Sequence, residues 1–164
     1  ESFPPVARAD ARVLVLGSMP SRKSLAAAQY YAHPQNRFWP IMGELFGAGR
    51  ELPYAERLAI LQEHHIALWD SARRCRRDLS ADATMRDVEP NDVAGLLTRC
   101  PGIHTVCCNG RKAEELFRRL VLPTLDAAEQ LEIHYLPSTS PAHASLDAAA
   151  KLRKWCVVAE RAAR

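Results

Sequence analysis

The chain has 164 residues, of which 48% are hydrophobic and 25% charged, and its formal net charge is +3. These values are ordinary for a soluble globular protein, and the length suits one domain, residues 1–164, with a proper core. No apolar run approaches the length of a membrane span and no signal-peptide pattern opens the chain, so we expect a cytoplasmic protein without a membrane partner. The mild positive charge is compatible with a nucleic-acid partner.

The cysteine pattern bears on cofactors and on the cellular compartment. The five cysteines are Cys75, Cys100, Cys107, Cys108 and Cys156. An odd number without paired spacing argues against a disulfide framework and favours a reducing compartment. There is no Cys-x-x-Cys and no histidine pair at zinc spacing, so we expect neither a metal site nor an iron–sulfur cluster. All five are interpreted as buried small hydrophobic side chains.

Short aliphatic runs alternate with helical patterns along the chain. Strands are predicted at residues 12–16, 66–70, 103–108 and 131–136, and helices at 24–29, 38–46, 54–64, 91–99, 111–120 and 146–162. Asn91 is the expected cap of the fourth helix, and residues 78–90 are expected to be irregular. The alternation predicts an α/β fold: a three-layer α/β/α sandwich around a four-stranded, mostly parallel sheet.

Small or polar residues stand where each predicted strand ends. In chain order these are Gly17 with Ser18 and Met19, then Asp70, then Asn109, and finally Ser138, Thr139 and Ser140. Binding sites in parallel sheets lie beyond the carboxyl ends of the strands. We therefore expect these four segments to meet at one edge of the sheet.

Residues 30–39, Tyr-Tyr-Ala-His-Pro-Gln-Asn-Arg-Phe-Trp, concentrate aromatic side chains just before a helix. Pro34 blocks a helix at His33, and no helical or strand period fits the run, so we expect a shaped loop. It is either a pocket that sandwiches a planar ring or simply the buried face of a helix with its lid. Asn36 and Arg37 favour the pocket, because both are costly to bury without partners.

Several familiar motifs are incomplete or missing. The segment Gly17–Ser24 nearly matches a phosphate-binding loop, but Arg22 replaces the second glycine and Pro20 removes a backbone amide. There is no Gly-x-Gly-x-x-Gly and no Gly-x-Ser-x-Gly. Burial is favoured over a nucleophilic role for Cys107 and Cys108. Arginines 73, 74, 76 and 77 are either phosphate contacts or a solvated face.

Six segments, in their order along the chain, resemble motifs of the uracil-DNA glycosylase superfamily, and most of all its hypoxanthine-DNA (deoxyinosine) glycosylase group. They are Gly17-Ser18-Met19-Pro20-Ser21, residues 30–39, Leu68-Trp69-Asp70, Pro90-Asn91-Asp92, residues 109–113 and residues 137–142. The resemblance covers nearly the whole chain. It implies an enzyme without a cofactor that flips a deaminated base, hypoxanthine or uracil, out of double- or single-stranded DNA and hydrolyses its N-glycosidic bond. We expect it to act as a monomer.

The resemblance also implies a catalytic residue. Other branches carry a catalytic Asn or Asp in the first loop and a His at the head of the second, where this chain has Met19 and either Ser138 or Thr139. In the hypoxanthine-type group the Asn of the Asn-Arg-Phe-Trp run acts instead, which corresponds to Asn36. An amide is no strong base at neutral pH, so Asn36 either stabilises the leaving base or positions the attacking water.

The remaining expected roles fall into two groups. Base contacts are expected from the backbone at Gly17, Ser18 and Met19, from Phe38 as the stacking face, and from Asp70 and Asn109. Asp70 either accepts the ring N–H of the base or merely caps its loop. DNA contacts are expected from Ser21, Ser138, Thr139, Ser140 and Pro141, with Ala142 and His143 at the position of a wedge between bases.

Two other functions remain open. Met19 and Ser138 replace catalytic residues of other branches, which is also compatible with a DNA-binding homologue that has lost its catalytic activity. Measurable turnover would exclude this alternative. A hydrolase of free nucleosides is the other alternative. A requirement for DNA, with affinity that falls as salt rises, would exclude it.

Overall fold

Four parallel strands form the centre of the molecule in a computed structural model that describes residues 1–78, 84–142 and 146–164. They are β1 (Val13–Gly17), β2 (Ile66–Asp70), β5 (Thr105–Asn109) and β6 (Glu132–Leu136), in the spatial order β2-β1-β5-β6. All three pairings are parallel. The predicted α/β fold is confirmed, and every strand of the central sheet is parallel to its neighbours.

Burial explains the aliphatic character of the strands. Every residue of β1 and β2 is buried, because helices cover both faces of the sheet. The outer edge of β2 is covered near its middle by Val6, which exchanges two backbone hydrogen bonds with Leu68, at 2.9 and 2.8 Å. At the other edge β6 is only partly buried, and Tyr135 is exposed.

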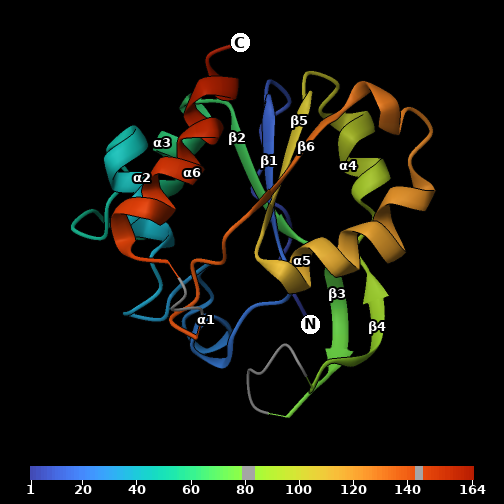
Figure 1. The fold of residues 1–164 in the computed structure, drawn as a ribbon, viewed down its shortest axis with the longest axis horizontal. Helices are drawn as coiled ribbons and strands as arrows, with labels where there is room; N and C mark the ends of the chain where they lie inside the picture. Colours follow the sequence, from blue (N-terminus) through green and yellow to red (C-terminus); the bar gives the residue numbers. More distant parts are fainter. Residues whose placement is uncertain (79–83, 143–145) are drawn as a thin grey trace.

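Helices form the outer layers of the sandwich (Figure 1). One face of the sheet carries α2 (Phe38–Phe46), α3 (Tyr54–Glu63) and α6 (Ala148–Ala162), and the other carries α4 (Val93–Arg99) and α5 (Arg111–Leu116). Trp39, Phe38 and Trp155 fill the first core, and Phe117 is the largest fully buried side chain of the second, which also contains Trp69. The predicted three-layer arrangement is therefore present.

Local signals set the helix ends. Gly47, in the left-handed conformation at φ 78°, ends α2. The Asp147 carboxylate accepts the Ala150 N–H at 2.7 Å and starts α6. The expected cap of α4 is wrong by one residue, because Asp92 accepts the Gly95 N–H at 2.9 Å while the Asn91 side chain is buried elsewhere.

Two other expectations on secondary structure are corrected. Part of the segment expected to be irregular is a strand, because β3 (Ala72–Arg76) and β4 (Arg86–Pro90) pair as an antiparallel hairpin next to the carboxyl end of β2. The predicted helix 111–120 is regular only through α5 and continues as a π-helical segment, Phe117–Val121. The short helix α1 (Arg22–Ala27) follows the loop after β1.

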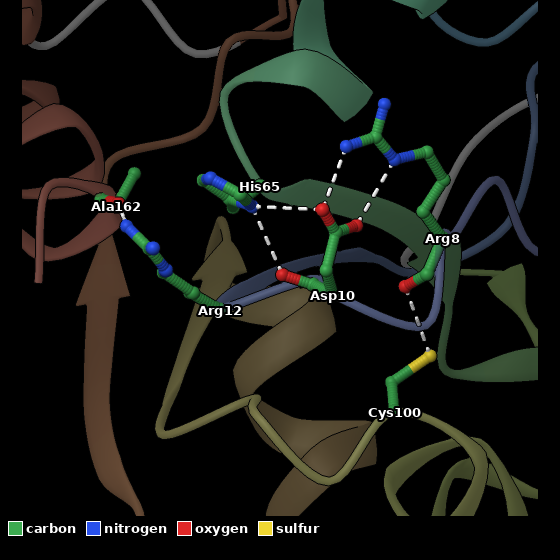
Figure 2. A network of polar contacts seen from close by, with 6 residues as sticks. All are labelled: Arg8, Asp10, Arg12, His65, Cys100 and Ala162. Carbon is green, nitrogen blue, oxygen red and sulfur yellow. Dashed lines mark hydrogen bonds and ion pairs between the residues drawn. The ribbon is translucent and has the colours of Figure 1, made fainter.

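A polar network at the amino end of the sheet joins segments that are far apart in sequence (Figure 2). Arg8 donates two hydrogen bonds to the Asp10 carboxylate, at 3.0 and 2.6 Å, and His65 lies 3.3 Å from the same group. These contacts, above all the Arg8 hydrogen bond, lower the pKa of Asp10 to about 2. Arg12, one residue before β1, donates to the Ala162 carbonyl at 2.9 Å and so links the sheet to α6.

Within the parts of the chain that the structure describes, no helix has both the length and the apolar character needed to cross a bilayer.

Candidate active site

The carboxyl ends of β1 and β2 form the floor of the candidate site. A β-carbon added to Gly17 would lie 2.4 Å from the Asp70 carboxylate and 3.0 Å from the Tyr31 hydroxyl. The glycine therefore leaves room for two polar groups that a larger residue would displace. Asp70 itself is buried. A carboxylate, a phenol and the backbone of Gly17 thus meet at the expected edge of the sheet.

Backbone hydrogen bonds fix the loop that follows β1. The Gly17 and Ser18 carbonyls accept the N–H groups of Ser71 and Ala72, at 2.8 and 3.0 Å. The buried Asn91 side chain donates to the Asp70 carbonyl at 2.8 Å and to the Ala72 carbonyl at 3.2 Å. Asn91 thereby supports the segment that carries Asp70. A long-range role of this kind leaves no local pattern in the sequence.

Phe38 does not occupy the position expected of it. Its side chain is completely buried, and the Tyr31 ring stacks on it with centroids 4.0 Å apart and planes 28° from parallel. Trp39 and Trp155 contact the same ring edge-on. Phe38 has no ring face open to a base while Tyr31 keeps this position, so Tyr31 is the aromatic residue next to Gly17 and Asp70.

Tyr31, and not Phe38, is the aromatic residue next to Gly17, and its backbone conformation is unusual. Tyr31 has φ 56°, in the left-handed region that residues other than glycine rarely adopt, and Ala28 does likewise at φ 53°. Burial first, and then the nearby Asp70 carboxylate, raise the pKa of Tyr31 far above its ordinary value. The hydroxyl therefore stays protonated and is available as a hydrogen-bond donor.

Asn36 lies at the start of α2 and is partly buried. Its Oδ1 accepts the Phe38 N–H at 2.9 Å, and its backbone N–H donates to the His33 carbonyl, also at 2.9 Å. Among the described residues, none accepts a hydrogen bond from the side-chain amide nitrogen, Nδ2. Asn36 thus combines a structural contact through its oxygen with an amide donor that remains available.

Arg50 holds the loop that contains Asn36. Its guanidinium donates to the main-chain carbonyls of Tyr31, His33 and Asn36, at 3.4, 2.5 and 3.1 Å. Burial, followed by the neighbouring Arg57, lowers the pKa of Arg50. We refer to residues 30–37 as the aromatic loop. Arg50 was not expected in the site, since it follows α2 and no motif marks it.

Asn109, at the end of β5, contacts the loop after β6. Its Nδ2 donates to Thr139 Oγ1 at 2.9 Å, and its Oδ1 accepts the Thr139 N–H at 3.0 Å. Both ends of the Asn109 amide are therefore used within the protein. The Thr139 carbonyl in turn accepts the Arg37 N–H at 2.9 Å. Thr139 is buried and joins the aromatic loop to β5.

The loop after β6 is shaped by its own serines. Ser138 Oγ accepts the Ser140 N–H at 3.1 Å, and Ser140 Oγ accepts the Ala142 N–H at 3.2 Å. Neither hydroxyl donates a hydrogen bond to a described residue, and Pro141 and Ala142 are exposed. We refer to residues 138–142 as the serine loop. His143, expected beside Ala142, lies outside the described residues.

The other expected residues are placed as follows. Ser21 caps α1, accepting the Ser24 N–H at 3.2 Å. Met19 lines a hollow between α1 and the β3–β4 hairpin. Cys107 is fully buried, and burial raises its pKa to about 12, which excludes it as a thiolate nucleophile at neutral pH. Of the five cysteines, Cys75 and Cys156 are partly exposed, so the expectation of complete burial is wrong for these two.

The arrangement provides hydrogen-bond donors and acceptors. The described residues include no group of three or more His, Cys, Asp or Glu side chains placed to hold a metal ion. The candidate groups are therefore an acceptor at Asp70, an aromatic ring at Tyr31, an amide at Asn36 and hydroxyls on the serine loop.

Comparisons with known proteins identify the family of the chain. The family model "Uracil DNA glycosylase superfamily" matches residues 4–161. A relative from Methanosarcina acetivorans named hypoxanthine DNA glycosylase is 38% identical over 69% of this chain and 72% of its own length. One from Methanosarcina barkeri with the same name is 34% identical over 70% of this chain and 73% of its own length.

A solved structure extends the match to the whole fold. It is a solution NMR structure, from Methanosarcina acetivorans, of a protein given the provisional name uracil DNA glycosylase. It superposes with a TM-score of 0.83 and 31% identity, covering 100% of this chain and 98% of that one. The chain belongs to the uracil DNA glycosylase superfamily and is a DNA N-glycosylase.

Proposed function

We propose that this chain removes hypoxanthine from DNA, accepts uracil as a second base, and uses Asn36 as the catalytic residue. Support for the choice of base comes from the two relatives named hypoxanthine DNA glycosylase. The single structural observation that carries the proposal is the buried Asp70 carboxylate, which lies over Gly17 beside Tyr31.

Deamination changes the hydrogen-bonding edge of a base, and Asp70 suits the changed edge. Adenine and cytosine carry an unprotonated ring nitrogen beside an amino group. Hypoxanthine and uracil carry a ring N–H beside a carbonyl. A carboxylate accepts from the ring N–H and repels a ring-nitrogen lone pair. Asp70 therefore favours the deaminated base over its parent, once the nucleotide has been flipped out of the stack.

Tyr31 and Asn36 supply the rest of the proposed pocket. The Tyr31 ring is the aromatic surface nearest Asp70 and gives the flipped base a wall to pack against. Cleavage of the N-glycosidic bond leaves negative charge on the departing base. A preorganised amide donor stabilises that charge. The available Nδ2 of Asn36 suits this role, since its Oδ1 is occupied by the Phe38 N–H.

The serine loop is proposed to hold the phosphates that flank the flipped nucleotide. The hydroxyl donors of Ser138 and Ser140 suit phosphate oxygens. Asn109, which was expected to contact the base, is better suited to holding Thr139 in place. Water completes the hydrolysis, and the product is DNA with an abasic site.

Single-turnover base release tests the proposal. Four oligonucleotide duplexes that differ only in one nucleotide, deoxyinosine, deoxyuridine, deoxyadenosine or deoxycytidine, are incubated with excess enzyme and then cleaved with alkali. We expect release of hypoxanthine and, more slowly, of uracil, and no release of adenine or cytosine. Asp70→Asn should slow release about 10- to 100-fold, because hydrogen bonds to charged groups contribute about 1.5–3 kcal/mol.

Two controls make the result specific. Asp126→Asn removes an exposed carboxylate far from the candidate site and should leave the rate unchanged. Tyr31→Phe keeps the ring on Phe38 but removes the hydroxyl, whereas Tyr31→Ala removes both. Equal rates for wild type and Asp70→Asn would contradict the role of Asp70. Bound DNA without release of any base would favour an inactive homologue.

A further inference from the structure

A basic hollow of about 350 Å³ lies between α1 and the β3–β4 hairpin, outside the proposed base pocket. Four arginines line it: Arg22 from α1, and Arg76, Arg77 and Arg86 from the hairpin and the residue after β3. Among the described residues that line it, Glu1 is the only acid. The hollow is therefore strongly positive, although the net charge of the whole chain is only +3.

The hairpin brings two of these arginines face to face. Arg76 and Arg86 are directly opposite each other in the antiparallel pairing. Like charges at such a position destabilise a hairpin. The Asp87 carboxylate lies 3.7 Å from Arg76, but both side chains are largely exposed, at 78% and 70%, so this pair screens little charge. No carboxylate among the described residues lies within ion-pair distance of Arg86.

The positive charge is confined to one end of the hairpin. Near its base, Glu89 pairs with Arg73 at 2.5 Å and with Arg74 at 3.2 Å, and Glu1 lies 3.7 Å from Arg74, so two carboxylates face these two arginines. At the hollow end, Asp87 is the only described carboxylate within ion-pair distance of either Arg76 or Arg86. The described residues therefore leave more positive charge at the hollow end of the hairpin than at its base.

The hollow adjoins the loop that follows β1. The Arg77 guanidinium donates to the Pro20 carbonyl, and Met19 is one of the lining residues. The hairpin also leaves β2 directly after Asp70, where backbone hydrogen bonds attach it to Ser18. A DNA strand with one nucleotide in the base pocket therefore passes close to these arginines if the strand continues toward the hairpin.

We propose that the β3–β4 hairpin and α1 form a second DNA contact, which binds backbone phosphates flanking the damaged nucleotide through Arg76 and Arg86. This rests on the proposed function, which requires a nucleotide of a longer strand to enter the site. Guanidinium groups present a planar fork of donors that matches phosphate oxygens. The contact is independent of sequence and adds affinity and positioning rather than base recognition.

Binding to an undamaged 20-base-pair duplex, measured by fluorescence anisotropy over a series of salt concentrations, tests the contact without depending on any damaged base. The test variant is R76Q/R86Q. The matched control is R118Q/R119Q, which removes the same charge from the exposed π-helical segment after α5. Each phosphate contact contributes about 0.9 to the slope of log K against log salt. The hairpin variant should therefore lose about 1.8 from that slope and bind at least about tenfold more weakly at low salt.

Catalysis and binding are separated in a second arm. At saturating deoxyinosine DNA, R76Q/R86Q should release base at the wild-type rate, because it retains Asn36 and Asp70. If neither variant changes the slope, or both change it equally, the hairpin contact is refuted. Loss of affinity for a single-stranded RNA of the same sequence, with DNA affinity retained, would also refute it. Failure of the wild type to release hypoxanthine while R76Q/R86Q still weakens DNA binding would refute the proposed function and leave the hairpin contact supported.

Discussion

Asn109 holds Thr139 by two hydrogen bonds, one to its backbone N–H and one to its hydroxyl, across thirty residues of chain. The Thr139 carbonyl is taken by the Arg37 N–H. One buried threonine thus positions the serine loop against both β5 and the aromatic loop. The two loops that resembled the superfamily most specifically are connected through this residue, so a change in one displaces the other.

Asn109→Ala should therefore destabilise the fold and weaken DNA binding together. The substitution leaves the Thr139 N–H and hydroxyl without their partners, and a buried unsatisfied group costs about 1–3 kcal/mol. We expect the free energy of unfolding in urea to fall by about that amount. The double variant with Thr139→Ala should lose less than the sum of the two single variants. Strict additivity would show that the two side chains act independently.

Asn36→Asp separates the structural role of Asn36 from its proposed chemistry. A carboxylate oxygen still accepts the Phe38 N–H, so α2 should start normally, but the Nδ2 donor is lost. We expect single-turnover release of hypoxanthine to fall about 10²- to 10³-fold, the usual cost of removing one such donor. The melting temperature should stay within the range of Gln35→Ala, a neighbouring exposed control. A variant as fast as wild type would assign Asn36 to the positioning of water.

Whether the sequence predicted an element of the fold depended on the type of interaction that forms the element. Aliphatic runs such as 66–70 identify a buried parallel strand, because both faces of the sheet are covered. The hairpin escaped prediction because ion pairs such as Arg73–Glu89, and not an alternation of apolar residues, mark its strands. Asn91 and Asp92 are both good helix caps, and only the buried bonds of Asn91 show which residue caps α4.

The positions of the loops at the strand ends were predicted, but the arrangement of their side chains was not. The strand-end positions of Asp70 and Asn109 follow from the topology of a parallel sheet. The choice between Phe38 and Tyr31 as the aromatic wall depends on the left-handed backbone of Tyr31, which no propensity indicates. The role of Asn36 stays a prediction until its variants are measured.

Gly17→Ala tests whether base recognition requires a residue without a side chain at position 17. The added methyl would lie 2.4 Å from the Asp70 carboxylate and 3.0 Å from the Tyr31 hydroxyl, so one of these groups must shift. We expect hypoxanthine release to become undetectable in the single-turnover assay. Overpacking should lower the free energy of unfolding by about 1–3 kcal/mol. A stable Gly17→Ala enzyme with the wild-type rate would show that base recognition does not use this floor.

Asp10→Asn probes the polar network at the opposite end of the sheet. The pKa of Asp10 is about 2 in the folded protein and is ordinarily 3.8, so its contribution to stability is complete above pH 3.8 and is lost as the pH falls through 2. The variant should melt slightly below wild type at pH 7, and the two curves should converge near pH 2. Melting temperatures at several pH values, with Asp126→Asn as the control, provide the measurement. A difference that persists unchanged at pH 2 would exclude this electrostatic origin.

Arg50 anchors the aromatic loop to uncharged main-chain carbonyls, and among the described residues it has no carboxylate partner. Dissolved ions compete effectively with exposed ion pairs and phosphate contacts, but far less with donors directed at uncharged, partly buried carbonyls. Ionic strength should therefore affect DNA binding and base release differently. Rising salt should release the DNA, whereas the rate constant for base release from fully bound DNA should stay constant, since the loop that carries Asn36 keeps its shape.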